Sequence, residues 1–203
     1  QGGIYKDRST PPTPAANVQP SNKSPVNLIK TSKSDIPNSD IHLNMQISKH
    51  FKLKHFIVGD HTLAEIVPQV EMSRSDIIRN LQALAVNCLD PIYEKYGPFE
   101  VNSWFRTVAF NAQLSKNPDA QASSVSQHLF GEALDFKFTD LKGLNDYIKR
   151  GKEIAAMNIP YHQLAIEHNS SGGMWLHIGL RSLPRRGKNR HEFLVINLTR
   201  KKK

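Results

Sequence analysis

Two residues in one short run have the chemistry of metal ligands. The run extends from Ser126 to Asp135 (SQHLFGEALD); within it His128 offers a neutral imidazole and Asp135 a carboxylate, both good ligands for Zn²⁺. Gly131 permits a turn that folds one of these side chains back over the other. The chain has one cysteine, Cys88, so a metal site must be built from His, Asp or Glu.

A third ligand is predicted further along the chain. Residues 174–180 alternate between an apolar face and a second face that carries His177. A single histidine on a strand is more often a core or surface residue than a ligand. Because His128 and Asp135 occur in the same chain, we interpret His177 as the third ligand. Two histidines and one aspartate leave the fourth position of a tetrahedral zinc ion open, as in catalytic sites.

Glu167 is the candidate catalytic base. Residues 169–173 (NSSGG) are typical of a hairpin loop, and closure about Ser171 would pair Glu167 with Trp175. Glu167 and His177 would then be diagonal neighbours on one face, about 7 Å apart at Cα. Zinc would lower the pKa of a bound water to about 7, and Glu167 would take its proton and pass it to the leaving amine. The alternative is a surface carboxylate on a strand.

Arg106 lies between a predicted strand and a predicted helix, with Asn111 one turn further on. Its guanidinium could clamp a substrate carboxylate or steady the oxyanion of a tetrahedral intermediate. The alternative is an ion pair that braces the loop.

Several neighbours are expected to support the site. Ser126 and Gln127 would shape the loop and orient His128. Trp104 and Trp175 would line a substrate cleft or pack in the core. The other histidines have no matching spacing and are interpreted as structural or solvated: His42, His50, His55, His61, His162, His168 and His191.

The elements that must position these residues begin with a long amphipathic helix. Its apolar residues recur every three or four positions from Ile77 to Tyr96, and Cys88 on this face is expected to be inert core. Ser73 or Ser75 is the candidate N-cap, Gly97 follows the helix, and Pro91 predicts a break or kink inside it.

The remaining elements are shorter. We predict strands at 99–104, 133–138, 163–168 and 174–180, and helices at 107–114 and from Thr139 or Asp140 to about Arg150, with a polar loop at 115–126. Strands and helices do not alternate regularly, which predicts an α+β fold with an antiparallel sheet flanked by helices.

Composition divides the 203 residues into three parts: an extended arm (1–45), a compact domain (46–181) and a basic tail (182–203). The arm holds six of the twelve prolines and too few apolar residues to offset its ordering entropy. Residues 181–203 carry nine Lys/Arg and one Glu, which is +8 of the net +9. Such a tail aids solubility or attracts anionic polymers, phosphates or acidic proteins. Nucleic-acid binding is disfavoured because interleaved aromatic residues and a known module are lacking.

No apolar run reaches the roughly 18 residues of a membrane span, and the polar start has no signal-peptide core. We therefore expect a soluble chain that is exported, if at all, by another route. The absence of an initiating Met indicates processing or numbering from within a longer product.

These residues together resemble the D-alanyl-D-alanine carboxypeptidase-like zinc peptidases, which have the Hedgehog/D-Ala-D-Ala peptidase fold, and especially their short phage-borne branch. The resemblance covers about residues 47–181. Ser103 and Arg106 match the S-G-Y-R segment of that branch, Glu167 falls in its D-Q-L-I-x-E segment, and His177 in its W-V-H segment. The chain departs from the pattern at Trp104-Phe105, at His162 and in a basic insertion at 150–153, which concern specificity rather than metal binding.

The resemblance implies that His128, Asp135 and His177 are zinc ligands, that Glu167 is the catalytic carboxylate and that Arg106 contacts the substrate or transition state. Ser103 would contribute beside the ligands or to the substrate. The implied substrate is a peptidoglycan stem peptide or cross-link, cut by a carboxypeptidase or an endopeptidase.

The arm, the tail and the missing signal peptide favour a lysin carried on a phage tail or baseplate, in which residues 1–45 and the tail bind other virion proteins and the enzyme acts in the bacterial wall or periplasm. The alternatives are a free endolysin and a structural tail protein that retains the peptidase fold.

Overall fold

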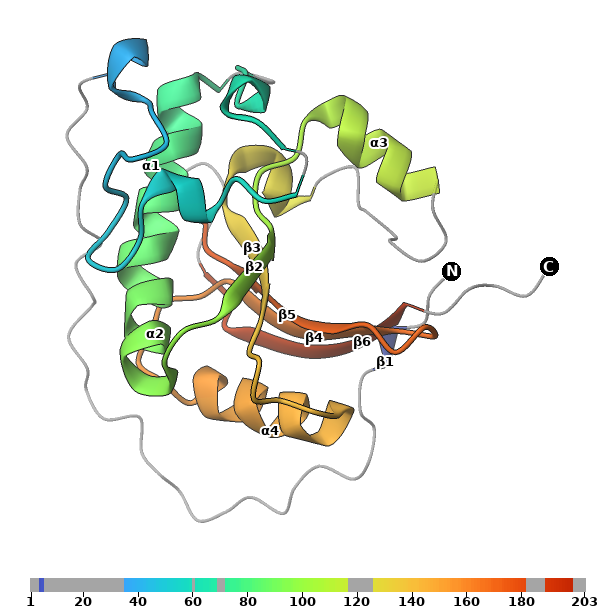
Figure 1. The fold of residues 1–203 in the computed structure, drawn as a ribbon. Helices are drawn as coiled ribbons and strands as arrows, with labels where there is room; N and C mark the ends of the chain where they lie inside the picture. Colours follow the sequence, from blue (N-terminus) through green and yellow to red (C-terminus); the bar gives the residue numbers. More distant parts are fainter. Residues whose placement is uncertain are drawn as a thin grey trace.

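The computed structural model describes residues 4–5, 35–59, 61–68, 72–116, 126–181 and 189–198. In these residues a six-stranded sheet has the strand order β1-β6-β4-β5-β3-β2 (Figure 1). The strands are β1 (Ile4–Tyr5), β2 (Glu100–Ser103), β3 (Ala133–Lys137), β4 (Gln163–Asn169), β5 (Met174–Gly179) and β6 (Glu192–Leu198). The helices are α1 (Arg74–Leu84), α2 (Asp90–Tyr96), α3 (Val108–Lys116) and α4 (Leu144–Ala155). The fold is therefore α+β, as predicted.

The sheet is mixed, so the prediction of a wholly antiparallel sheet is wrong. Every neighbouring pair is antiparallel except β4 and β6, which run parallel with Gln163 beside Glu192 and Asn169 beside Leu198. A parallel neighbour requires the chain to return to the end of the sheet at which the first strand began. The hydrogen bond from the Glu192 N–H to the His162 carbonyl marks that return.

Strand β6 lies inside the segment that was predicted to be a basic tail. Its apolar run Phe193-Leu-Val-Ile196 is flanked by basic residues, and Phe193 and Val195 pack against the core. The prediction of a tail rested on the net charge of the segment and did not take this short apolar run into account. The folded part of the chain therefore extends at least to Leu198, while residues 182–188 and 199–203 lie outside the described residues.

The predicted arm also contributes to the folded body. Ile41 is buried, and Ser75 bonds through its hydroxyl to the backbone N–H and carbonyl of Ile36, at 3.0 and 2.9 Å. Strand β1 pairs with β6. The boundary at residue 46 is thus too late, and residues 6–34 of the predicted arm lie outside the described residues.

The long helix forms as two α-helices joined by a π-helical segment. Ser73 caps α1 by accepting a hydrogen bond from the Asp76 N–H, which confirms one of the two predicted caps. The π-helical segment, Ala85–Leu89, ends two residues before Pro91, which has no N–H to bond the preceding turn. Gly97 follows α2 with a positive φ of 81°. The predicted break therefore occurs, with Pro91 in the first turn of α2.

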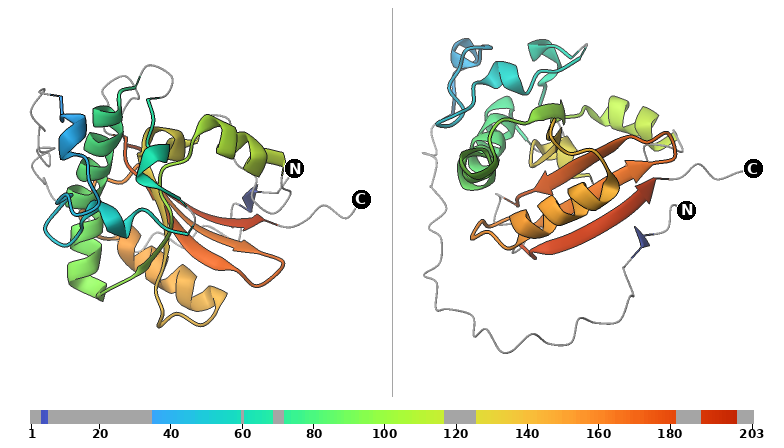
Figure 2. Two further views of the ribbon diagram at one scale, coloured as in Figure 1. Left: turned by 45° about the horizontal axis from the view of Figure 1, so that its top comes forward. Right: turned by 60° about the horizontal axis from the view of Figure 1, so that its bottom comes forward.

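Helix α4 begins and ends later than predicted. Its N-cap residue is Gly143 rather than Thr139 or Asp140, and its last residue is Ala155 rather than about Arg150. The Asp146 carboxylate accepts hydrogen bonds from the N–H groups of Lys142 and Gly143, which fixes the start. Gly151 does not end the helix. It allows α4 to lie close against the sheet (Figure 2), because a Cβ there would be 2.6 Å from Ile166.

One face of the central sheet is apolar, and the other carries polar residues. Leu164, Ile166, Leu176 and Ile178 point to the face that α4 covers, and all are fully buried. The opposite face carries the polar candidates Asp135, Glu167 and His177. No helix among the described residues is long and apolar enough to span a membrane.

Candidate metal centre

The three predicted ligands come from a turn and two adjacent strands. His128 lies in a 3₁₀ turn, Gln127–Phe130, which ends at Gly131 with φ +68°. A Cβ at Gly131 would be 2.9 Å from the Ile77 carbonyl oxygen, so only glycine lets the turn approach α1 this closely. The turn leads into β3 and returns the chain so that Asp135 lies beside His128.

The hairpin has the predicted register. Glu167 pairs with Trp175, and Ala165 pairs with His177. On the other side of β5, His177 pairs directly with Asp135 of β3. Alternation along the strands therefore places Asp135, His177 and Glu167 on one face of the sheet.

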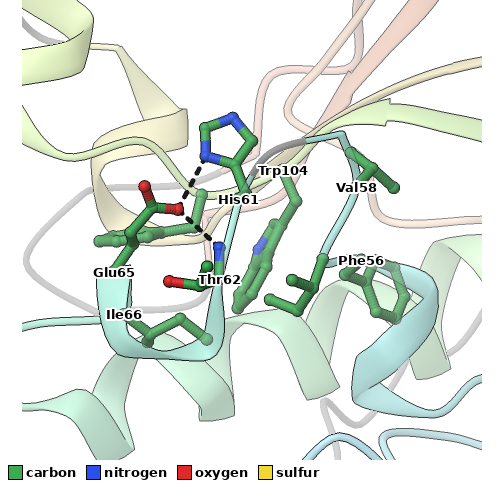
Figure 3. Close-up of a pocket in the computed structure, with 9 residues that line it drawn as sticks. Phe56, Val58, His61, Thr62, Glu65, Ile66 and Trp104 are labelled. Atoms are coloured by element: carbon green, nitrogen blue, oxygen red, sulfur yellow. Dashed lines mark hydrogen bonds and ion pairs between the residues drawn. The ribbon is translucent and has the colours of Figure 1, made fainter.

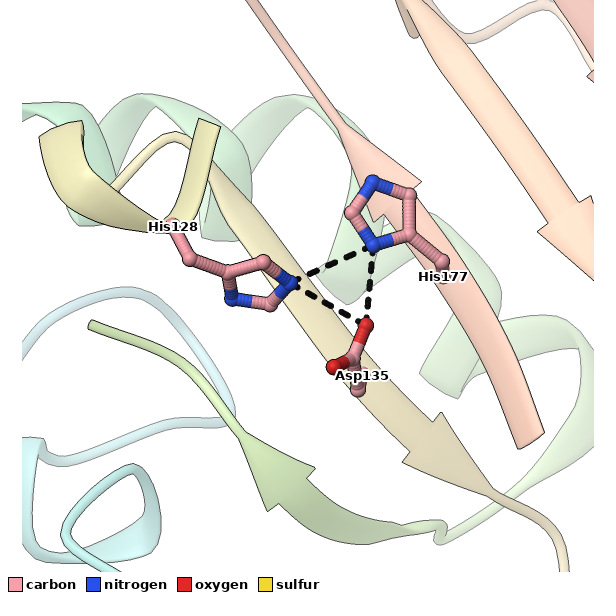
Figure 4. A group of neighbouring side chains, drawn as sticks. All are labelled: His128, Asp135 and His177. Carbon is pink, nitrogen blue, oxygen red and sulfur yellow. Dashed lines mark hydrogen bonds and ion pairs between the residues drawn. The ribbon is translucent and has the colours of Figure 1, made fainter. Parts of the chain in front are cut away.

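The three ligand atoms are mutual neighbours (Figure 4). Asp135 Oδ1 is 2.8 Å from His177 Nδ1 and 3.2 Å from His128 Nε2, and the two nitrogens are 3.3 Å apart. All three residues are buried, and among the described residues they are the only group of three or more His, Cys, Asp or Glu that could hold a metal ion. Ligand atoms 2.0–2.1 Å from a tetrahedral zinc ion are separated by about 3.3 Å. The donor set and its spacing therefore fit such an ion.

The orientation of His128 is fixed by a backbone carbonyl. His128 Nδ1 lies at hydrogen-bond distance from the carbonyl oxygen of Trp104. A carbonyl only accepts, so Nδ1 must carry the hydrogen, and the lone pair of Nε2 then points into the cluster. Histidines that ligate metals are commonly held in this way through their second nitrogen.

Arg106 holds the other side of the cluster. Its Nη2 donates to Asp135 Oδ2 at 2.7 Å, and its Nε donates to Ser103 Oγ at 3.1 Å. The backbone N–H of Arg106 also donates to the His128 carbonyl at 3.1 Å. Oδ2 is thus occupied, and Oδ1 is the oxygen that faces the two imidazoles. The ion-pair interpretation of Arg106 describes this arrangement, and a contact with substrate stays a prediction.

The buried charges shift one another's protonation. Burial acts to raise the pKa of Asp135, but the charges and hydrogen bonds of His128 and His177 hold it well below the usual carboxyl range. Burial lowers the pKa of His128. Burial acts in the same direction on His177, but its hydrogen bond and ion pair with Asp135 outweigh this and raise its pKa. Asp135 is therefore ionised at neutral pH, as a metal ligand must be.

Glu167 lies at the edge of the cluster. Its Oε2 accepts a hydrogen bond of 2.8 Å from the indole N–H of Trp175. Burial and then the negative charge of Asp135 raise the pKa of Glu167 above its ordinary value. A raised carboxyl pKa is what a general base working near neutral pH requires.

The sequence did not reveal the part played by Trp104. Its side chain is buried in the core and donates from Nε1 to the Gly131 carbonyl at 3.1 Å, while its own carbonyl orients His128. A hydrogen bond to a backbone carbonyl cannot be predicted from the pattern of side chains. Ser126 has the predicted loop-shaping role, since its hydroxyl accepts a hydrogen bond of 3.4 Å from the His128 N–H. Asn111 is buried in α3.

A second pocket is lined in part by Trp104 and by a His–carboxylate pair (Figure 3). It has a volume of about 20 Å³ and is lined in part by Phe56, Ile66 and Trp104. His61 Nδ1 lies 3.0 Å from Glu65 Oε2 at its rim, and the pair also borders an open hollow of about 480 Å³. Among the described lining residues the pair supplies two metal-binding side chains, one fewer than the buried cluster.

No protein-family model matches the chain, and no curated protein is significantly similar to it. The site must therefore be interpreted from its own residues.

Proposed function

We propose that this protein is a zinc-dependent peptidase. The observation that carries the proposal is the buried cluster of His128, Asp135 and His177, with Glu167 on the same face of the sheet. Three protein ligands with a neighbouring carboxylate of raised pKa are the donor set of a hydrolytic metal site rather than of a closed structural one. His128 Nε2, Asp135 Oδ1 and His177 Nδ1 would hold the ion.

The chain's own residues supply the proton chemistry. Bound Zn²⁺ would act as a Lewis acid toward water and the scissile carbonyl. Glu167 in its ionised form takes the proton of the attacking water and delivers it to the leaving amine nitrogen. The Trp175 N–H occupies Oε2 of Glu167 and so orients the carboxylate, leaving Oε1 to carry the proton. Arg106 binds Oδ2 of Asp135 and so turns Oδ1 toward the imidazoles.

The resemblance to D-alanyl-D-alanine carboxypeptidase-like peptidases supports peptidoglycan stem peptides or cross-links as the substrate. In this proposal the protein is a lysin of a phage tail or baseplate that binds virion neighbours through residues 1–45 and the basic segment from 182, with a free endolysin as the alternative. A structural tail protein that keeps the peptidase fold is the competing function.

Zinc analysis combined with peptidoglycan digestion tests the proposal. Wild-type protein, Glu167→Gln and the control Glu65→Gln should each bind about one equivalent of zinc. Stem-peptide cleavage should fall by roughly 10²–10⁴-fold in Glu167→Gln and be unchanged in Glu65→Gln. A wild-type protein without zinc, or a fully active Glu167→Gln, would contradict the proposal. Zinc-loaded wild type without activity would favour the structural role.

A further inference from the structure

The end of β5 is shaped around the side chain that precedes His128. Gly179 lies two residues after His177 and therefore on the same face of the sheet. A Cβ at Gly179 would be 2.2 Å from Oε1 of Gln127, 2.8 Å from its Cδ and 3.0 Å from its Nε2. Carbon atoms do not approach other heavy atoms this closely. The Gln127 amide thus occupies the space that any side chain at position 179 would need.

From this contact we propose that Gln127 and Gly179 are positioning residues that set the separation between His128 and His177. The inference rests on the proposed zinc centre, because the separation matters only if both imidazoles bind one ion. Gln127 directly precedes one ligand, and Gly179 follows the other on the same strand face. Their contact ties the ligand-bearing turn to the ligand-bearing strand.

Other contacts fix the turn to different elements. The Asn80 amide donates to the Phe130 carbonyl, which holds the turn to α1, and the Trp104 indole donates to the Gly131 carbonyl. Neither of these bonds reaches β5. The distance from the turn to β5 therefore depends on contacts with β5 itself. The Gln127 amide lies at that boundary, next to the hydrogen bond from the Leu180 N–H to the Glu132 carbonyl.

The backbone of β5 at Gly179 is held in place on both sides. Its backbone is paired with Ala133 on β3 and with Gln163 on β4, and its carbonyl accepts a hydrogen bond of 2.6 Å from the His162 N–H. Its φ is not in the left-handed region, so alanine is compatible with the backbone. A substitution therefore acts through space alone, and the Gln127 side chain, or the turn that carries it, must move instead of the strand.

The amide group of Gln127 does not stabilise the fold through a hydrogen bond from its nitrogen. Its Nε2 is buried, and no described residue accepts a hydrogen bond from it. A buried donor without an acceptor is destabilising, and an apolar side chain would avoid that cost. Local choices that oppose stability are expected at functional sites. The position of the amide between two ligand-bearing segments accounts for it.

Zinc affinity and stability, measured on the same variants, test the inference. Chelator competition gives the affinity, and the melting temperature of zinc-free protein gives the stability. Gly179→Ala should weaken zinc binding by about 10–100-fold, the range for groups that orient ligands. Gln127→Ala should also weaken it, while the melting temperature stays the same or rises because the unpaired buried donor is gone. The double variant should bind zinc more tightly than Gly179→Ala, since the new methyl fills the space that the amide leaves.

Gly151→Ala is the matched control. A Cβ there meets Ile166 at 2.6 Å and Phe193 at 2.8 Å, a clash of similar severity on the opposite face of the sheet. It should lower the melting temperature and leave zinc affinity unchanged. Wild-type affinity in Gln127→Ala, or no recovery in the double variant, would overturn the inference. Absence of zinc from the wild type would instead refute the proposed function, and the inference with it.

Discussion

Two of the His–carboxylate contacts among the described residues have nearly the same distance and very different surroundings. His61 and Glu65 lie 3.0 Å apart at the rim of a pocket, with side chains 35% and 45% exposed. His128 and Asp135 lie 3.2 Å apart in the interior, with side chains 3% and 7% exposed. Contact distance alone therefore does not distinguish a surface ion pair from a buried group that could hold a metal ion.

The difference lies in what holds the second atom of each group. In the buried cluster the Trp104 carbonyl holds the second nitrogen of His128, and Arg106 holds the second oxygen of Asp135. His128 and Asp135 thus each present one defined atom, Nε2 and Oδ1, to the cluster. In the exposed pair Glu65 Oε2 accepts from both Thr62 and His61, so its interactions are used to cap a 3₁₀ turn. Preorganisation is the property that separates the two groups.

Removal of one ligand should give the largest effect. His177→Ala leaves two ligands and should reduce the bound zinc from about one equivalent to none after dialysis, because two protein ligands are one fewer than a catalytic zinc site uses. His61→Ala is the control and should retain about one equivalent. Metal analysis by mass spectrometry measures both. Equal zinc loss in the two variants would remove the distinction between the groups.

Removal of the brace on Asp135 should give an intermediate effect. Arg106→Met should weaken zinc binding by about 10–100-fold, since Asp135 loses the cation that turns its Oδ1 toward the imidazoles. The control is Arg79→Met, which breaks ion pairs with Asp35 and Asp76 near the surface. Chelator competition should find the control unchanged. A smaller loss in Arg106→Met than in Arg79→Met would contradict this assignment.

The smallest effect is a contrast in carboxyl titration. In zinc-free protein, burial and the charge of Asp135 raise the pKa of Glu167, whereas the Thr62 N–H lowers the pKa of Glu65. Carboxyl ¹³C NMR should therefore find Glu167 titrating above, and Glu65 below, the ordinary value of 4.5. Glu167 accepts a proton only when ionised, so activity should be lost as acid protonates it. The reverse order of the two titrations would contradict the base assignment.

Local patterns sufficed for much of the fold and the site. The hairpin register followed from alternation and a symmetric loop, and it placed Glu167 and His177 correctly on one face. The Ser73 cap and the break near Pro91 followed from residues whose backbone chemistry is restrictive. The grouping of His128 with Asp135 followed from a turn that needs Gly131. In each case nearby residues decide the structure.

The features that the sequence did not predict depend on distant partners. The pairing of β6 with β4 is a choice among sheet edges, which a charged flanking sequence does not reveal. The helix predicted to end at about Arg150 continues to Ala155, and the close approach of Gly151 to Ile166 is visible only in the packed structure. The Trp104 carbonyl and the space above Gly179 have no side-chain signature at all.

The position of β3, β4 and β5 inside the sheet has a consequence for fluctuations. Each of these strands is paired on both sides, so the backbone at Asp135, Glu167 and His177 cannot fray as an edge does. Amide hydrogens there should exchange only through large-scale opening, whereas a short turn opens at low cost. Exchange of amide hydrogens should therefore be faster in the turn bearing His128 than in these three strands, even though hydrogen bonds from Asn80 and Trp104 hold that turn in place.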